Sequence, residues 1–156
     1  WVCWIVGDGN KKADLIRLSN SLGLQEDIVY WGNRKDVPFL LSISDIFVHP
    51  SHLDNQPLSV IEAQLAGKAI IVSDAGGMPE MVKHGVTGVI SPVGDPMSLC
   101  MNINYLLEHE PYRNNLGSNA QNWALSHWSF DQSVDKILKV YENAKNKRNT
   151  SDGNQS

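Results

Sequence analysis

The 156 residues, 42% of them hydrophobic, are enough to build the core of one domain of ordinary size. The formal net charge of −4 and the scattered distribution of 13 lysine and arginine residues exclude a surface that follows nucleic-acid phosphates or a basic membrane anchor. No apolar run approaches the roughly 20 residues that span a bilayer.

The two cysteines and the N-terminal segment bear on location. Cys3 and Cys100 fall in separate predicted elements, and two cysteines in a chain with a good core predict buried thiols in a reducing compartment. The N-terminus has no basic region followed by an apolar region, as an export signal would have. We therefore expect a cytoplasmic protein. The strand-like start at Trp1, without an initiator methionine, indicates a fragment of a longer chain.

Short apolar segments alternate with amphipathic ones through the first part of the chain. This pattern is typical of βαβ units and predicts an α/β fold, a Rossmann-like parallel sheet with helices on both faces. The predicted strands are residues 1–6, 28–31, 46–49, 69–73 and 88–91. The predicted helices between them are residues 11–22, 37–44, 58–66 and 78–83.

A helical C-terminal appendage is predicted after the sheet, in residues 97–108, 112–125 and 130–145. The last of these is amphipathic, with apolar residues three and four apart. Residues 146–156 contain no apolar side chain and are predicted to be disordered. The expected organisation is thus one Rossmann-like domain over residues 1–145, lacking its first strand and helix, followed by a tail.

Glu62 stands out in the apolar segment 57–67. Leu58, Glu62 and Leu65 share one helical stripe, because residues three and four apart are neighbours on a helix. A carboxylate on an apolar face costs free energy unless it is paired. The pattern therefore predicts a polar partner, such as a ligand hydroxyl. A solvated or capping carboxylate is the alternative.

The loop formed by residues 50–56 joins a predicted strand to a predicted helix. Ligands of parallel α/β sheets bind at such strand ends, where helix N-termini present backbone N–H groups. Pro57 suits the first turn of the helix. We expect the N–H groups of Leu58, Ser59 and Val60 to bind a diphosphate, and Glu62, one turn further, to accept hydrogen bonds from a ribose diol.

Two further strand ends carry candidate residues. Gly7 and Gly9 resemble the opening of a dinucleotide-binding fingerprint, but Lys12 occupies the third glycine position, so a tight turn is the alternative. Arg34 and Lys35 follow the next strand. They are expected to flank a base or a phosphate, or else to be solvated charges at a helix start.

Metal and acyl-transfer chemistry have no support in the sequence. The five histidines show no metal-ligand spacing, and no Asp-x-Asp pair is present to hold a divalent ion on a diphosphate. The serines lack the G-x-S-x-G context of a hydrolase nucleophile. We expect no metal and no cofactor.

Several motifs in order resemble the C-terminal nucleotide-sugar-binding domain of retaining glycosyltransferases of family four, which have the two-domain GT-B architecture. The resemblance runs from Ile5 to about Tyr141. Its motifs are IVGDG (5–9), WGNR (31–34), SDIFVHPS (44–51), PLSVIEA (57–63), GGMPE (76–80), GVTG (85–88) and WSF (128–130).

The resemblance implies roles for individual residues. The family carries E-x7-E, in which the first glutamate contacts the donor sugar and the second binds the ribose. Asp54 and Glu62 occupy these positions, with Asp54 one methylene shorter. The diphosphate would be held by backbone groups of Gln56, Pro57, Leu58, Ser59 and Val60. The loop of Gly32, Asn33, Arg34 and Lys35 would approach the base, and Gly7 would border the site.

The resemblance also implies a function. The chain would be the donor-binding domain of a retaining, metal-independent glycosyltransferase that uses a nucleotide-diphosphate sugar, preferably a UDP-sugar. The acceptor, a glycan or lipid-linked oligosaccharide of cell-surface polysaccharide synthesis such as O-antigen, would bind an N-terminal domain that precedes Trp1. That domain could also attach the enzyme peripherally to the inner face of the plasma membrane.

A basic pair that neutralises the leaving diphosphate in the family would precede Trp1 as well. The fragment is therefore expected to bind donor but not to transfer sugar. The alternatives are a GT-B-like nucleotide-sugar epimerase and a catalytically idle nucleotide-binding module.

Overall fold

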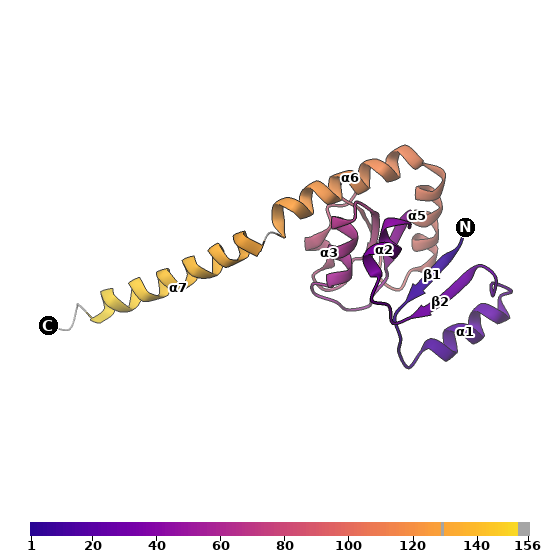
Figure 1. Cartoon of the computed structure of the whole chain (residues 1–156), viewed down its shortest axis with the longest axis horizontal. Coiled ribbons are helices and arrows are strands. Elements are labelled where there is room, and N and C mark those ends of the chain that lie inside the picture. Colours follow the sequence, from indigo (N-terminus) through magenta and orange to yellow (C-terminus); the bar gives the residue numbers. More distant parts are fainter. Residues whose placement is uncertain (129, 153–156) are drawn as a thin grey trace. The chain divides into compact units, whose positions relative to one another are not determined.

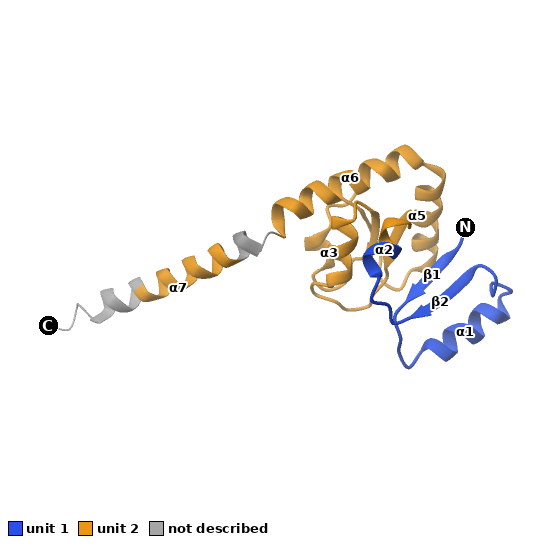
Figure 2. Cartoon of the chain, viewed as in Figure 1, with its two compact units in different colours: residues 1–40 blue, residues 41–156 orange. Residues whose placement is uncertain are grey.

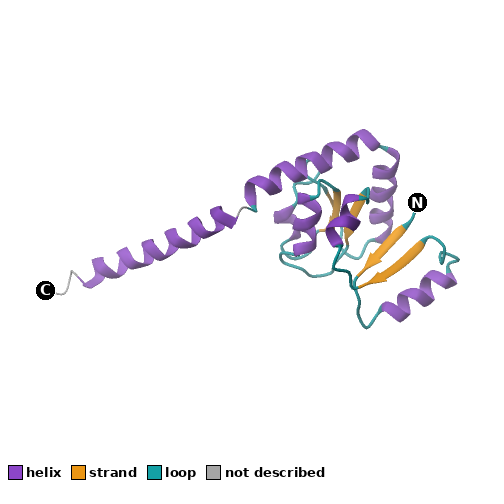
Figure 3. Ribbon diagram, in the orientation of Figure 1, coloured by secondary structure: helices purple, strands orange, loops and turns teal. Residues whose placement is uncertain are grey.

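The computed structural model describes residues 1–128 and 130–152. The chain divides into two compact units, residues 1–40 and residues 41–156 (Figure 2). The boundary between them falls within the short helix α2 (Val37–Ser42). Strands and helices alternate as far as β5, and helices follow (Figures 1 and 3).

The first unit is a βαβ motif. Strands β1 (Cys3–Val6) and β2 (Ile28–Gly32) pair in parallel, and α1 (Lys12–Ser21) connects them. Parallel neighbours require such a crossover, because a tight turn cannot join them. Ser19 is buried on α1, and its hydroxyl accepts a hydrogen bond from Tyr30 of β2 at 3.3 Å. The strands therefore end side by side, at Val6 and Gly32.

The second unit contains a three-stranded parallel sheet in the order β3 (Ile46–His49), β4 (Ala69–Ser73), β5 (Val89–Ser91). All five residues of the central strand β4 are buried. A strand covered on both faces has this continuous apolar character in place of alternation.

Helices cover the sheet of the second unit on both faces. Ala69, Ile71 and Val89 pack against Leu106 of α5 (Pro96–Glu108) and Leu116 of α6 (Glu110–His127). Ile70 and Val72 point to the opposite face, because side chains alternate along a strand. Helices α3 (Leu58–Leu65) and α4 (Met78–Met81) contact β4 and bury Val60, Ala63, Met78 and Met81. The final helix is α7 (Phe130–Asp152).

The predicted elements are present, and the differences lie at their ends. β1 begins at Cys3, because its first ladder partner is Ile28. α4 ends at Met81, where Val82 turns to an extended conformation. α7 continues to Asp152, so residues 146–152 are helical where disorder was predicted. Extending an existing helix costs little free energy compared with nucleating one, and no proline or glycine interrupts residues 146–152. Residues 153–156 of the predicted tail lie outside the described residues.

The cysteine prediction was wrong in one respect. Cys3 and Cys100 are free thiols, but both are exposed rather than buried. Cys3 lies at the first pairing position of β1, and Cys100 lies on α5 away from its buried residue Leu106. Among the described residues, no helix has the length and apolar character to cross a membrane.

Helices α3 and α6 approach closely at Gly117. A Cβ atom there would overlap the carbonyl oxygen of Gly67, just after α3. We expect Gly117→Ala to lower the free energy of unfolding by about 1–3 kcal/mol, because overpacking outweighs the better helix propensity of alanine. Chemical denaturation measures this. Ser118→Ala, at an exposed position of the same helix, is the control and should stay within about 0.5 kcal/mol of the parent. An equally stable Gly117→Ala would contradict the close approach.

Candidate functional site

In the first unit, two predicted site glycines meet at the carboxyl ends of β1 and β2. The backbone N–H of Gly7 donates to the carbonyl of Gly32 at 2.7 Å. Both glycines have positive φ, +126° and +63°, which side chains rarely adopt. Lys12 reaches this corner, with its ammonium 3.3 Å from the carboxylate of Asp8. The corner is therefore a tight, glycine-dependent turn with a cation beside it.

Arg34 is already engaged within the loop that follows β2. Its guanidinium donates twice to Asp36, from Nε at 2.8 Å and from Nη2 at 2.6 Å. It also lies over the Trp31 ring, 5.1 Å from the centroid. The hydrogen bonds with Asp36 raise the pKa of Arg34 and lower that of Asp36. Asn33 and Lys35 are exposed beside it. The guanidinium is thus held in place, with its charge partly neutralised.

In the second unit, the loop after β3 leads into α3. Pro57 is buried at the N-cap with φ −65° and ψ 124°, and α3 begins at Leu58. Pro57 thus lies one residue before the predicted position in the first turn. Gln56 is exposed just ahead of it.

The diphosphate prediction is partly corrected at this helix end. The N–H of Val60 donates to the carbonyl of Pro57 at 3.1 Å and is not free. Within the described part of the chain, the N–H groups of Leu58 and Ser59 have no acceptor. The first N–H groups of a helix lack intrahelical partners, and the positive end of the helix dipole adds to their affinity for anions. Two of the three expected donors therefore remain.

The premise used for Glu62 was wrong. Leu58, Glu62 and Leu65 do share a stripe, but this stripe is the exposed face of α3, with Leu58 73% exposed and Leu65 40% exposed. The buried face is formed by Val60, Ala63 and Gln64. Tertiary packing selects the buried face, so Glu62 needs no protein partner to offset burial. Its carboxylate is accessible, about 6 Å along the helix from Leu58.

Asp54, the other acidic residue of the pair, is half-buried and has contacts at both ends. Its carboxylate Oδ2 lies 3.3 Å from Nε2 of His49, and its carbonyl accepts from the N–H of Gly77 at 3.0 Å. From the sequence, His49 was considered as a metal ligand and as part of a family motif, but not as a partner of Asp54. Its place at the strand end, five residues before Asp54, is the signal that could have identified it.

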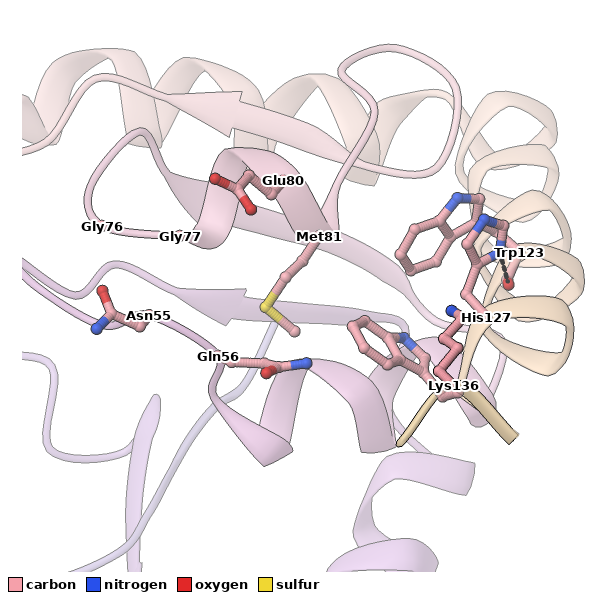
Figure 4. Close-up of a pocket in the computed structure, with 10 residues that line it drawn as sticks. Asn55, Gln56, Gly76, Gly77, Glu80, Met81, Trp123, His127 and Lys136 are labelled. Carbon is pink, nitrogen blue, oxygen red and sulfur yellow. Dashed lines mark hydrogen bonds between the residues drawn. The ribbon is translucent and has the colours of Figure 1, made fainter. Parts of the chain in front are cut away.

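A cavity of about 610 Å³ opens beside the same loop (Figure 4). Gln56 is the only predicted site residue among those that line it. The others are Asn55, Gly76, Gly77, Glu80, Met81, Trp123, His127, Trp128 and Lys136. Trp123 stacks on His127 at 4.2 Å and meets Trp128 edge to face at 5.5 Å. Trp123, His127 and Trp128 were missed because the predicted site was confined to strand ends and to the helix that follows β3.

The predicted site residues thus form two groups. Gly7 and residues 32–35 belong to the first unit, and Asp54, Glu62 and residues 56–60 belong to the second. Among the described residues, no three histidine, cysteine, aspartate or glutamate side chains are grouped as metal ligands would be.

The sequence model of the family described as "Glycosyl transferases group 1" matches residues 1–123. The chain belongs to this glycosyltransferase family. The match contains every residue predicted for the site, and it confirms the resemblance drawn from the sequence motifs.

Two relatives illustrate the range of this family. The Campylobacter jejuni protein "N,N'-diacetylbacillosaminyl-diphospho-undecaprenol alpha-1,3-N-acetylgalactosaminyltransferase" is 38% identical over 115 residues, which cover 72% of this chain and 30% of the relative. The Escherichia coli protein "UDP-Gal:alpha-D-GlcNAc-diphosphoundecaprenol alpha-1,3-galactosyltransferase" is 31% identical over 138 residues, which cover 88% of this chain and 35% of the relative. The chain spans about a third of the length of these glycosyltransferases.

A solved structure agrees with the fold. Anabaena Alr3699/HepE, in complex with UDP, is similar with a TM-score of 0.85 and 28% identity, covering 91% of this chain and 41% of that one. The same protein has also been solved with UDP-glucose. The predicted fold class, the Rossmann-like C-terminal half of a GT-B glycosyltransferase with a helical appendage, is confirmed.

Proposed function

We propose that this chain binds the donor in a retaining, metal-independent glycosyltransferase, which transfers a sugar from a UDP-sugar to a glycan or lipid-linked acceptor. The observation that carries the proposal is the likeness to a structure solved with UDP and with UDP-glucose. Relatives named for transfer to undecaprenol-linked acceptors support a role in cell-surface polysaccharide synthesis. The acceptor would bind an N-terminal domain, and the enzyme would act in the cytoplasm, attached peripherally to the membrane through that domain.

The second unit would hold the diphosphate and the ribose. The N–H groups of Leu58 and Ser59 lie at the positive end of the α3 dipole and would donate to phosphate oxygens. Glu62, accessible one turn further, would accept from the ribose hydroxyls, and hydrogen bonds to a charged carboxylate are among the stronger ones. No cofactor is needed for this mode of binding.

Two further contacts are predicted independently of each other, that of Asp54 in the second unit and that of the loop after β2 in the first unit. Asp54 would accept from a hydroxyl of the donor sugar, because its Oδ1 has no partner among the described residues. The loop of residues 32–35, next to the turn formed by Gly7 and Gly32, would contact the base. The Trp31 ring and the hydrogen bonds with Asp36 leave Arg34 as a positioned, partly neutralised cation.

A nucleotide titration tests the proposal. UDP, GDP and ADP would each be titrated into the chain while backbone amide chemical shifts are recorded. We expect saturable shifts with UDP at residues 32–35 and 58–62, weaker shifts with the purine nucleotides, and no shifts at residues 104–108, which serve as an internal control at the end of α5. The absence of saturable shifts at residues 58–62 with all three nucleotides would overturn the proposal.

A further inference from the structure

The loop that carries Asp54 is hydrogen-bonded to the end of β4 and to the turn that follows it. The backbone N–H of Gly77 donates to the carbonyl of Asp54 at 3.0 Å, and the Ser73 hydroxyl donates to the carbonyl of Ser51. A Cβ atom at Gly76 or Gly77 would overlap the carbonyl oxygens of Asp54 and Asn55. The glycine pair therefore allows the two loops to touch, and this contact sets the backbone position of Asp54.

The Asp54 side chain is held separately, by His49. The imidazole Nε2 lies 3.3 Å from Oδ2, and only 23% of the His49 side chain and 37% of the Asp54 side chain are exposed. His49 is the last residue of β3, and its ring stacks nearly parallel on Phe47, at 8° and 6.3 Å between centroids. The ring is thus supported by a strand of the core sheet. Because a carboxylate only accepts, Nε2 must carry the proton in this pair.

We propose that His49 is a positioning residue for the donor sugar: it holds Oδ2 of Asp54 so that Oδ1 alone is presented to a sugar hydroxyl. The inference rests on the proposed function. The side chain of Asp54 is one methylene shorter than that of a glutamate. Its carboxylate therefore reaches a ligand from fewer backbone positions and side-chain rotations. A partner that restricts its rotation lowers the entropy lost when the sugar binds. His49 would thus contribute to the affinity for the sugar and not to the affinity for the nucleotide.

Two substitutions at His49 separate this role from packing. Leucine removes the hydrogen-bond donor and keeps an apolar side chain against Phe47. Glutamine keeps a hydrogen-bond donor, because its Nε2 group can replace the imidazole Nε2 and donate to Asp54. His52→Leu is the matched control, since His52 is exposed in the loop that carries Asp54. Affinities for UDP and for UDP-glucose, UDP-galactose and UDP-N-acetylglucosamine would be measured by calorimetry, together with amide spectra of the free chains.

We expect His49→Leu to weaken binding of the preferred UDP-sugar roughly tenfold, to change UDP affinity less than about twofold, and to shift the amide resonances of Asp54 and Asn55 in the free chain. His49→Gln should restore sugar binding to within about threefold of the parent and return those resonances. His52→Leu should change neither.

The outcomes distinguish the proposed function from the proposed role of His49. An unmodified chain that binds no UDP would overturn the proposed function. If UDP binds but the sugar adds no affinity in the unmodified chain, or if His49→Leu binds UDP-sugar as well as the parent does, the role of His49 is overturned while the proposed function stands. Free-chain resonances that are unchanged in His49→Leu would show that the histidine does not hold Asp54.

Discussion

Glu62→Ala is expected to weaken UDP binding by about 10- to 150-fold, or about 1.5–3 kcal/mol, without changing stability. The loss corresponds to charge-assisted hydrogen bonds between the carboxylate and the ribose hydroxyls. Stability should be unaffected, because Glu62 lies on the exposed face of α3 and its carboxylate has no partner among the described residues. Calorimetric titration with UDP measures the affinity, and thermal unfolding without ligand measures stability.

Glu108→Ala is the matched control for Glu62. It removes an exposed glutamate at the end of α5, so net charge changes by the same amount. We expect its UDP affinity to equal that of the parent. Equal affinities for Glu62→Ala and Glu108→Ala would refute the ribose-binding role and leave Glu62 as a solvated carboxylate, the alternative that its sequence context allows.

Gln64→Ala should lower the free energy of unfolding by about 2–4 kcal/mol. Gln64 is fully buried on the opposite face of α3, where its Nε2 donates to the carbonyl of Met81 at 2.7 Å and its Oε1 accepts from the Trp128 indole at 3.0 Å. Alanine would leave both groups without a partner, at about 1–3 kcal/mol for each that water cannot reach, and would open a cavity. Chemical denaturation monitored by tryptophan fluorescence measures the change.

Gln121→Ala provides the comparison. Gln121 makes the same kind of bond, from its amide to the carbonyl of Leu65 at 2.8 Å, but it is exposed, so water can replace it. We expect a loss below about 1 kcal/mol. If the two variants were equally destabilised, the bridge from α3 through Gln64 to α4 and to Trp128 would not be a central support of the unit.

The site shows how far sequence reasoning reaches. Gly7 was identified from turn chemistry and Gly32 from the family resemblance, and the structure places them in direct hydrogen-bond contact. The sequence likewise predicted three free N–H donors at the start of α3, but one of them, the N–H of Val60, donates to the carbonyl of Pro57. A helix pattern shows that donors exist near an N-terminus, but whether the first turn tightens depends on the local backbone.

Glu62 is the clearest case in which a prediction rested on a wrong premise, and its ribose-binding role stays a prediction. Periodicity correctly placed Leu58, Glu62 and Leu65 on one stripe, yet it could not tell which stripe faces the core. Val60 and Gln64 face inward because α3 packs against β4 and α6. An amphipathic pattern with apolar residues on two sides has no internal signal for this choice.

The order of the elements, the turn glycines and the family motifs follow from the sequence alone, because they depend on local periodicity and on residue types at short spacing. Other features depend on residues far apart in the chain, which only packing brings together. Among them are the buried face of α3, the approach of Gly117 to Gly67, and the contact of the Gly76–Gly77 turn with the Asp54 loop. His49 and Asp54 are only five residues apart in the chain, but their contact also depends on tertiary structure, because strand β3 and the hydrogen-bonded loop set its geometry.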